Sequence, residues 1–369
     1  MAHPPCTMKI AYIASFGNRF FNGVFRKIES QLAVWRSIAG LDVALFFRAK
    51  SGRLVPGGKP YPIAGMPTCS YNADLFRDLK AFDPDVVYLR HEIAGPQILQ
   101  ICRQFSGKIV LEINADLDAE LKLEGKTSVK RRAAFWINRL TEGYLERHLG
   151  GCVCVSSNFL EMFPKVPRDR KIVSPNAIDL AQHPVRKRPP AANERTALLF
   201  MGTPGQAWHG VDMLPALARS LPECDFHVVG PDALADAPSN MFFHGYLPPE
   251  ELPQLYARSH IGIGSLAFFR KNISEASPLK VREYIAAGLP VILGYADSAF
   301  GQQRPTWVCY VPPCEGGIEK PELVEMIRCF VKDNTAKVVS HQESASYIDA
   351  TLFEKRKMNT IQSWFSTTG

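Results

Sequence analysis

The sequence of 369 residues lacks several patterns that would place it in a common class. No apolar run is long enough to span a membrane, and Met1–Thr7 has no signal-peptide character. The dinucleotide fingerprint G-x-G-x-x-G is absent, which disfavours a dehydrogenase. The nine cysteines are scattered without metal-ligand spacing, and their number is odd. We therefore expect no zinc site and no disulfide framework, and a reducing, cytoplasmic location.

Charge is unevenly distributed along the chain. The net charge is +7, yet residues 1–185 hold 25 Lys and Arg against 17 Asp and Glu, and the remainder holds 18 against 19. No basic segment is interleaved with aromatics in the manner of a nucleic-acid-binding motif. The positive excess of the first half therefore favours an anionic membrane surface or an anionic substrate over nucleic acid.

Short apolar segments alternate with helical patterns throughout the chain, which predicts an α/β fold with parallel sheets covered on both faces. Residues 51–68 are rich in Gly and Pro and are interpreted as a loop. Cys152 and Cys154 are expected to pack as small hydrophobic residues of a strand. The expected strands of the first half are 8–15, 42–47, 85–90, 108–113, 152–157 and 171–175.

The same rhythm restarts after a charged, proline-containing segment at 186–195, which we interpret as a linker. Two Rossmann-like domains, 1–185 and 196–350, are therefore predicted, with ligands in a crevice that faces the carboxyl ends of both sheets. A last helix is expected in 351–369. The expected strands of the second half are 196–202, 225–230, 241–246, 260–265, 290–295 and 307–312.

The stretch 275–294, EASPLKVREYIAAGLPVILG, offers the clearest chemistry. Ser277 is predicted to cap a helix whose first residue is Pro278 and which ends before Gly288. The free N–H groups and the dipole at such a helix start attract an anion. Glu275 precedes the helix and Glu283 lies within it, so a diphosphate seat would have a carboxylate on either side to accept bonds from sugar hydroxyls.

This E-x7-E arrangement, followed by E-Y-x-A-x-G-x-P-V, resembles the signature of retaining glycosyltransferases, especially glycosyltransferase family 4. Three further segments resemble the same family: LLFMGTPGQAWHGVDMLPALA at 198–218, HGYLPPEELPQLYARSHIGIGSL at 244–266 and KIVSPNAIDL at 171–180. The resemblance implies a GT-B fold, with a donor-binding second domain and a closing helix that crosses back to the first.

The resemblance also implies roles for individual residues. Glu283 would hold the nucleotide ribose, and Glu275 would lie beside the donor sugar. The base would pair with backbone near Tyr246 and Leu247, and Gly17 would bring backbone close to the diphosphate. The remaining expected donor-binding residues are Thr203, His209, Ser277, Leu279 and Lys280.

The chain departs from the family at the phosphate clamp. Family members commonly carry an Arg and a Lys where this sequence has Thr203 and, by alignment, His209. Fewer cations leave the charge that develops on the leaving group poorly stabilised. Lys280, or Arg270 with Lys271, could replace them; otherwise Lys280 is a solvated helix residue and the protein a non-catalytic homologue.

In the first half, His91 follows the strand 85–90, and Asn114 ends the next one with Glu112 nearby. Family members often place a His near the sugar on that second strand, so we expect His91 and Asn114 to contribute to catalysis. The alternative, that His91 at the strand end has a structural role and no part in catalysis, stays open.

The function expected from these features is transfer of a sugar from a nucleotide-diphosphate donor to an acceptor hydroxyl with retention, in glycan, exopolysaccharide or glycolipid synthesis. The acceptor would be a carbohydrate or lipid-linked. No metal or other cofactor is expected, since no D-x-D stands at a plausible loop position. The alternatives are a non-catalytic nucleotide-sugar-binding homologue and a nucleotide-sugar 2-epimerase of the same fold.

The helix expected at Val129–Leu145 indicates where the protein could contact a membrane. Its apolar stripe, predicted to be the core face, comprises Val129, Ala133, Trp136, Ile137, Leu140 and Tyr144. The opposite side carries Phe135 with Arg131, Arg132 and Arg139, which is typical of a helix resting on an anionic bilayer. We expect peripheral contact with the inner face of the plasma membrane there; the alternative is a solvated basic face with Phe135 under a neighbouring loop.

Overall fold

A computed structural model describes residues 7–16, 23–49, 58–63, 70–125, 128–185, 195–315 and 317–366. They form two units, the first comprising Met1–Pro175 and Thr351–Gly369, the second Asn176–Ala350. The boundary therefore falls at residue 175, not at 185, because residues 176–185 pack with the second unit. The proposed linker lies outside the described residues except for Arg195.

The first unit is built on a seven-stranded parallel sheet in the order β3-β2-β1-β4-β5-β6-β7. Its strands follow the predicted apolar runs closely. The exception is β3 (Gly58–Pro62), which lies inside the segment interpreted as a loop and pairs with β2 at the sheet edge. The other strands are β1 (Met8–Phe16), β2 (Leu41–Ala49), β4 (Val86–Arg90), β5 (Ile109–Ile113), β6 (Leu149–Cys154) and β7 (Lys171–Val173).

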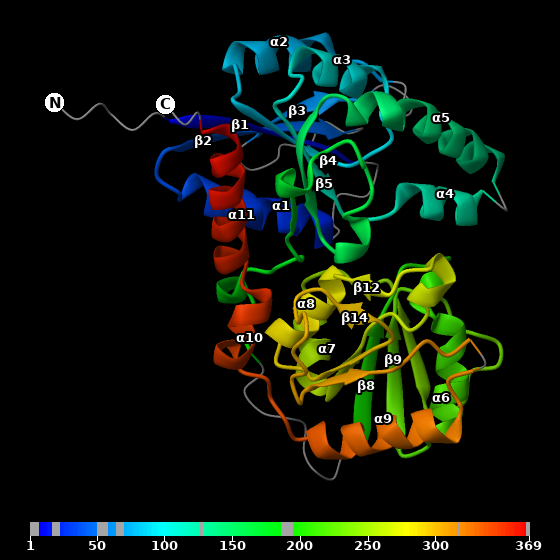
Figure 1. Ribbon diagram of the computed structural model, residues 1–369. Helices are drawn as coiled ribbons and strands as arrows, with labels where there is room; N and C mark the ends of the chain where they lie inside the picture. The colour runs from blue at the N-terminus through cyan, green and yellow to red at the C-terminus, as the bar shows by residue number, and fades with distance from the viewer. Residues whose placement is uncertain are drawn as a thin grey trace. The chain divides into compact units, whose positions relative to one another are not determined.

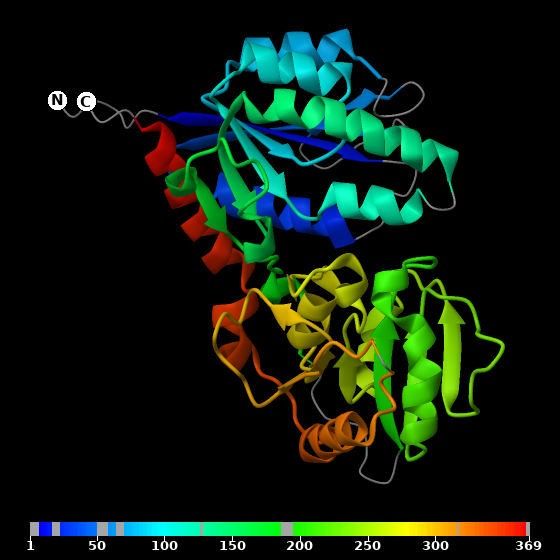
Figure 2. The ribbon, with the colours of Figure 1, turned by 45° about the vertical axis from the view of Figure 1, so that its right-hand side comes forward.

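Helices cover both faces of this sheet (Figure 1). The core on one face joins α1 (Gly23–Arg36) and α11 (Ala350–Phe365) to inward-facing strand residues, with Trp35 and Met358 fully buried. Figure 2 shows α2 and α3 on the opposite face. Right-handed crossovers dictate this division, because the chain moves outward from β1 to β2 and in the other direction from β4 to β5. The remaining helices are α2 (Ala73–Phe82), α3 (Pro96–Gln104), α4 (Leu117–Glu124) and α5 (Val129–Glu146).

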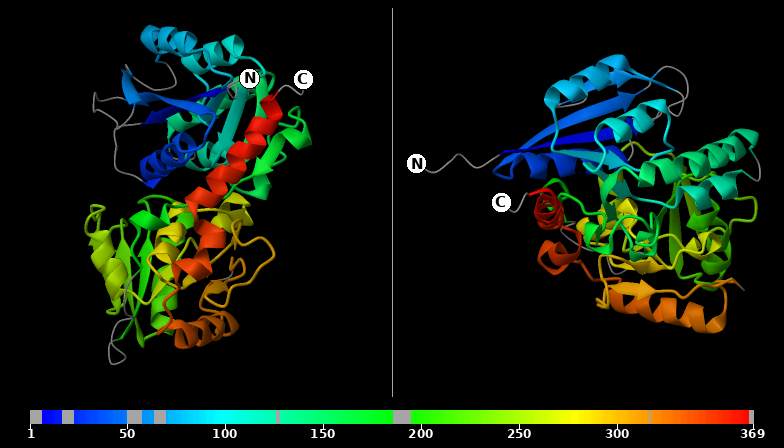
Figure 3. Two further views of the ribbon diagram at one scale, coloured as in Figure 1. Left: turned by 90° about the vertical axis from the view of Figure 1, so that its left-hand side faces the viewer. Right: turned by 45° about the horizontal axis from the view of Figure 1, so that its top comes forward.

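The closing helix α11 buries charged as well as apolar side chains in the first unit, which the sequence did not lead us to expect. Its apolar residues Met358, Ile361 and Trp364 join the core, as the helical spacing indicates. Glu354 and Lys357 are also buried, and they form an ion pair of 2.6 Å. The left panel of Figure 3 shows the length of this helix, in red.

The second unit contains a six-stranded parallel sheet in the order β10-β9-β8-β11-β13-β15. Every strand predicted for this half is present. They are β8 (Thr196–Met201), β9 (Cys224–Val229), β10 (Met241–Gly245), β11 (Ile261–Ile263), β13 (Val291–Leu293) and β15 (Val308–Tyr310). A separate two-stranded sheet pairs β12 (Glu275–Ala276) with β14 (Ala296–Asp297).

One face of this sheet packs against α6 (Leu214–Ser220) and α9 (Pro321–Asn334) in a continuous apolar core. The other face holds α8 (Leu279–Ala286). Gly262 of β11 makes room there for the ring of Tyr284, which a side chain at that position would meet within 2.5 Å. The remaining helices are α7 (Leu252–Arg258) and α10 (His341–Ile348). No described helix has both the length and the apolar character needed to cross a bilayer.

Candidate functional site

The second sheet has a topological switch point between β8 and β11. From β8 the chain builds outward through β9 and β10, then returns to β11 on the other side of β8. In parallel α/β sheets, the carboxyl ends of the strands at such a point are left open and ligands bind there. The strand end at Met201 is therefore where a site is expected.

Helix α8 is held at this strand end by both backbone polar groups of one residue, Met201. The backbone N–H of Met201 donates to the hydroxyl of Tyr284 at 2.7 Å. The carbonyl oxygen of Met201 accepts from Nζ of Lys280 at 2.8 Å. These two bonds fix the first turns of α8 against the end of β8.

Lys280 lies in an unusual setting for a lysine. Its ammonium stands 4.4 Å from the centre of the Phe200 ring, and its side chain is only partly exposed. Burial lowers the pKa of Lys280 to about 7. An amine with this pKa is about half protonated at pH 7, and a nearby anion raises the charged fraction.

Glu283 is one turn further along α8, so its side chain shares a face with that of Lys280. It is buried, and its Oε2 accepts from the hydroxyl of Tyr256 at 3.0 Å. The structure thus brings the expected ribose acid and the expected phosphate cation onto one short helix at the strand end.

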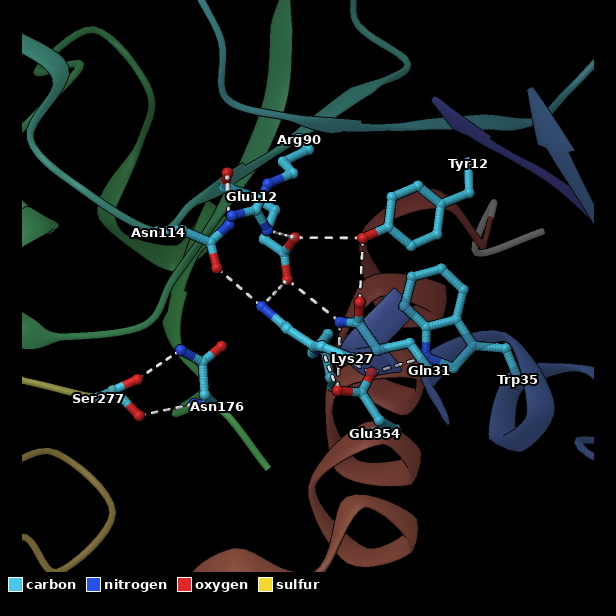
Figure 4. Close-up of polar contacts among 11 residues, drawn as sticks. Tyr12, Lys27, Gln31, Trp35, Arg90, Glu112, Asn114, Asn176, Ser277 and Glu354 are labelled. Atoms are coloured by element: carbon cyan, nitrogen blue, oxygen red, sulfur yellow. Dashed lines mark hydrogen bonds and ion pairs between the residues drawn. The ribbon is translucent and has the colours of Figure 1, made fainter. Parts of the chain in front are cut away.

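The start of this helix differs from the prediction. The helix begins at Leu279, and Pro278 occupies the cap position without a side-chain bond. Ser277 does not cap the helix, because its hydroxyl accepts from the backbone N–H of Asn176 at 2.8 Å and from Nη2 of Arg282 at 2.7 Å. Figure 4 shows the paired bonds between Asn176 and Ser277. The hydroxyl therefore holds two distant segments together.

Glu275 also lies in a different element from the one expected. It belongs to β12, which pairs with β14, and not to a loop. A fully buried ion pair between Arg282 of α8 and Asp297 of β14 anchors the strand that pairs with β12 to the helix. Glu275 is thus held on a defined strand next to the helix start.

Thr203 lies in the loop after β8, and His209 is the last residue of the short 3-10 helix η5 (Ala207–His209) that follows. The backbone N–H of Thr203 donates to Nδ1 of His209 at 3.0 Å, so the ring proton resides on Nε2. Burial, with Lys280 and Lys271 nearby, lowers the pKa of His209 to about 3. His209 is therefore a neutral hydrogen-bond donor at pH 7.

The other cations considered for a phosphate clamp are engaged. Arg270 makes a two-pronged ion pair with Asp212, at 2.9 and 2.7 Å. Lys271 is buried with its ammonium 4.5 Å from the Trp208 ring. Lys280, in contrast, donates to the carbonyl of Met201 at the end of β8.

Tyr246 and Leu247 follow β10, two strands from β8 in the sheet order. The Tyr246 side chain is 71% exposed, and Leu247 is partly buried. The ends of β9 and β10 are tied together by the N–H of Gly230, which donates to the carbonyl of Gly245 at 2.7 Å.

In the first unit, Gly17 lies outside the described residues. His91 follows β4, and burial lowers its pKa to about 4. Its ring packs edge-on against Phe163 at 5.4 Å. Its Nδ1 is buried and lacks a hydrogen-bond partner within the described ranges, so a ligand or a water could bond to it.

Asn114 belongs to a buried polar network that sequence reasoning missed (Figure 4). Nζ of Lys27 donates to Oδ1 of Asn114 at 2.7 Å and to Oε1 of Glu112 at 2.8 Å. Burial alone would raise the pKa of Glu112, but Lys27, Lys357 and Arg90 together lower it. Burial lowers the pKa of Lys27 to about 8.

This network extends to the closing helix. Nε2 of Gln31 donates to both Glu112, at 3.1 Å, and Glu354, at 3.3 Å. The indole of Trp35 donates to Glu354 at 2.7 Å. Two carboxylates and several cations thus lie inside one unit, joining α1, β5 and α11. The sequence shows the apolar spacing of α11, but it gives no sign that the charged side chains of this network face inward.

The prediction for α5 is inverted. The stripe expected to face the core is exposed: Val129 at 71%, Trp136 at 65% and Leu140 at 80%. The buried positions are on the opposite side, at Asn138 and Leu145, and Phe135 is half-buried. The arginines Arg131, Arg132 and Arg139 are exposed as expected.

Comparison with known structures resolves the fold. A sucrose-phosphate synthase from Thermosynechococcus elongatus superimposes with a TM-score of 0.69 over 98% of this chain and 100% of that chain, at 14% identity. The fold is that of the GT-B glycosyltransferases. The Anabaena protein Alr3699/HepE in complex with UDP-glucose superimposes with a TM-score of 0.63, over 96% of this chain and 100% of that chain, at 14% identity. A lipopolysaccharide outer core galactosyltransferase, WaaB, superimposes with a TM-score of 0.62, over 96% of this chain and 99% of that chain, at 15% identity.

The sequence itself matches a family model over part of its length. Residues 209–304 match the glycosyl transferase-like family. The matched range contains His209, Glu275, Lys280 and Glu283, and it ends before the last helices. No curated protein sequence matches the chain significantly. The second unit of this GT-B protein is therefore where the family resemblance is concentrated.

Proposed function

We propose that the protein is a retaining glycosyltransferase resembling family 4, which transfers a sugar from a nucleoside diphosphate donor to an acceptor hydroxyl. One observation carries the proposal. At the switch point of the second sheet, one short helix presents Lys280 and Glu283, with Lys280 Nζ 2.8 Å from the carbonyl of Met201. A cation for a diphosphate and an acid for a ribose diol thus share one face beside the carboxyl end of β8.

The donor chemistry follows from these groups. Lys280 becomes fully charged as the diphosphate approaches, which neutralises the leaving group where the family's usual cations are missing. Neutral His209 donates from Nε2 to an oxygen of the donor. Glu283 accepts from two vicinal hydroxyls, which selects a ribonucleotide over a deoxynucleotide. The Anabaena structures with UDP, glucose and UDP-glucose support a uridine nucleotide as the first donor to test.

Retention requires that the acceptor attack from the face that the leaving group vacates. Within the described part of the chain no nucleophile with a paired base is evident beside Lys280, which supports departure of the diphosphate on that same face, with a donor phosphate oxygen taking the acceptor proton. Glu275, held on β12, would stabilise the sugar. The acceptor that we propose is a carbohydrate or a lipid-linked saccharide, and we propose that the reaction needs no metal, so chelation should leave it unchanged.

The test is a thermal-shift screen with UDP, GDP, ADP and CMP, followed by calorimetry of the best ligand. A nucleoside diphosphate should raise the melting temperature, and Glu283→Gln should abolish most of the shift. Tyr256→Phe is the matched control, because it removes the hydroxyl that contacts Glu283 but keeps the carboxylate. If no nucleotide stabilises the protein, the proposed donor site is wrong.

A non-catalytic nucleotide-sugar-binding protein is the second candidate. It is favoured by one observation: Arg270 pairs with Asp212 and Lys271 lies over Trp208, so of the three cations considered only Lys280 remains for the diphosphate. Release of free nucleoside diphosphate from a nucleotide sugar separates the enzyme from the binder. A 2-epimerase would instead release the nucleotide together with an epimerised sugar.

A further inference from the structure

Helix α5 exposes an apolar stripe to solvent. Val129, Trp136 and Leu140 are 71%, 65% and 80% exposed, and Ile137 between them is 39% exposed. At 100° per residue these four positions, with Ala133 and Tyr144, fall within one side of the helix. They supply half of the eight large hydrophobic side chains that the described ranges expose. Apolar surface concentrated in this way marks an interaction site.

The opposite side of α5 already has its partners. Nδ2 of Asn138 donates to Asp118 of the preceding helix at 2.9 Å, and Arg139 makes an ion pair with the same carboxylate at 3.2 Å. Near its end, Leu145 is buried and Glu146 accepts from the backbone N–H of Lys165 at 2.7 Å. The helix is therefore attached along one side, and the exposed stripe is not the face that folding needs.

Basic residues flank the stripe. Lys130 lies on one side of it and Arg132 on the other, and both are exposed, as is Arg131. The sequence from Gly125 to Thr141 contains no Asp or Glu. Three cations in the first turn oppose the helix dipole, which favours negative charge at that end. A folding requirement does not explain this placement, whereas an anionic surface does.

The occupant that fits this combination is a lipid bilayer. An 18-residue helix, about 27 Å long, offers a straight apolar stripe with cations along its edges. Helices of this kind lie in the membrane interface with Trp and Leu at the headgroup boundary. The whole first half of the chain is basic, as an anionic membrane surface requires, since residues 1–185 hold 25 basic against 17 acidic residues.

We infer that α5 binds the surface of a membrane rich in anionic phospholipid through this exposed stripe, with Trp136, Ile137 and Leu140 inserted and Lys130 and Arg132 on lipid phosphates. Binding is peripheral and does not depend on the sugar-transfer site. It would bring the protein to a lipid-linked acceptor if the proposed function holds, but it is measurable in a protein with no activity.

The test is co-sedimentation with vesicles of phosphatidylcholine alone and with about one third phosphatidylglycerol. The full-length protein should bind the anionic vesicles and be released by salt. Trp136→Ser/Leu140→Ser should weaken binding at least tenfold at every salt concentration. Lys130→Glu/Arg132→Glu should weaken it by at least about 25-fold at low salt and much less at high salt, since each cation near such a surface contributes about fivefold and each new glutamate is repelled.

The matched control is Phe242→Ser/Arg258→Glu, which removes an exposed aromatic and an exposed cation in the second unit. It should bind like the parent. The substituted α5 residues are exposed, so the α5 variants should keep the parent's melting temperature. Failure of the parent to bind anionic vesicles, or equal binding by the α5 variants, would overturn the inference. Concentration-dependent dimerisation that the α5 variants abolish, without vesicle binding, would overturn it in favour of a second copy of the chain.

Discussion

Binding of a nucleoside diphosphate should draw about one proton from solution at pH 8. Burial lowers the pKa of Lys280 to about 7, so only about one tenth of the molecules carry its charge at this pH. A diphosphate beside the amine favours the charged form. Raising the pKa by two units takes about 2.7 kcal/mol, which one or two charge-assisted hydrogen bonds supply. About 0.8 proton is then taken up per nucleotide bound.

Calorimetry in two buffers of different ionisation enthalpy measures this uptake directly. At pH 8 the nucleotide is fully ionised, and the pKa of His209, about 3, is too low for that ring to take the proton. Lys280→Met should bind more weakly and take up none. Lys332→Met, which removes an exposed lysine of α9, is the control and should behave like the parent. The reasoning fails if the parent takes up no proton, or if Lys280→Met keeps both uptake and affinity.

Three further outcomes are expected. Glu283→Gln should reduce nucleoside diphosphate affinity about tenfold or more in calorimetry, because charge-assisted bonds to the ribose become neutral ones; unchanged affinity would mean that another group holds the ribose. Glu275→Ala should lower turnover while leaving the affinity for free nucleoside diphosphate nearly intact, and equal losses would indicate that the β12–β14 pair has collapsed. Glu354→Gln should lower the free energy of unfolding by about 3 kcal/mol in a urea titration, because the buried Lys357 loses its partner; Glu354→Gln/Lys357→Met should recover part of that loss, and no loss in the single variant would show that the network adds nothing.

Most of the fold could be predicted because its strands are short, continuous apolar runs, which is what burial on both faces requires. The strand β3 was missed for an equally physical reason. Its sequence GKPYP contains two prolines, which are typical of loops and are tolerated in a sheet only at an edge, where β3 lies. The boundary between the units was misplaced because residues 176–185 are bound to the second unit by long-range contacts such as Asn176 to Ser277.

The donor-side residues were partly predictable. Lys280 and Glu283 stand in a local pattern, one turn apart on one helix, so their spacing is visible in the sequence. The bonds of Ser277 were not, since its partner Asn176 lies 101 positions away. The buried charges Glu112 and Glu354 were missed because charged residues usually remain in solvent and their compensating partners come from three separate elements.

Helix α5 shows the limit of periodicity. The spacing of Trp136 and Leu140 correctly indicates one apolar stripe but not whether the stripe faces the core or the solvent. The orientation was decided by Asn138, whose bond to Asp118 holds the opposite side. A polar residue that anchors a helix has no periodic signature of its own.

The central claim, that the protein transfers sugar with retention, is tested most directly by a proton NMR time course. The full-length protein is incubated with the nucleotide sugar that binds best, with and without candidate acceptors. We predict release of free nucleoside diphosphate together with a product whose first-formed anomer matches that of the donor, and loss of both signals in Glu275→Ala. An inverted first-formed anomer, a 2-epimerised sugar, or a donor left intact with every acceptor despite measured binding would contradict the account.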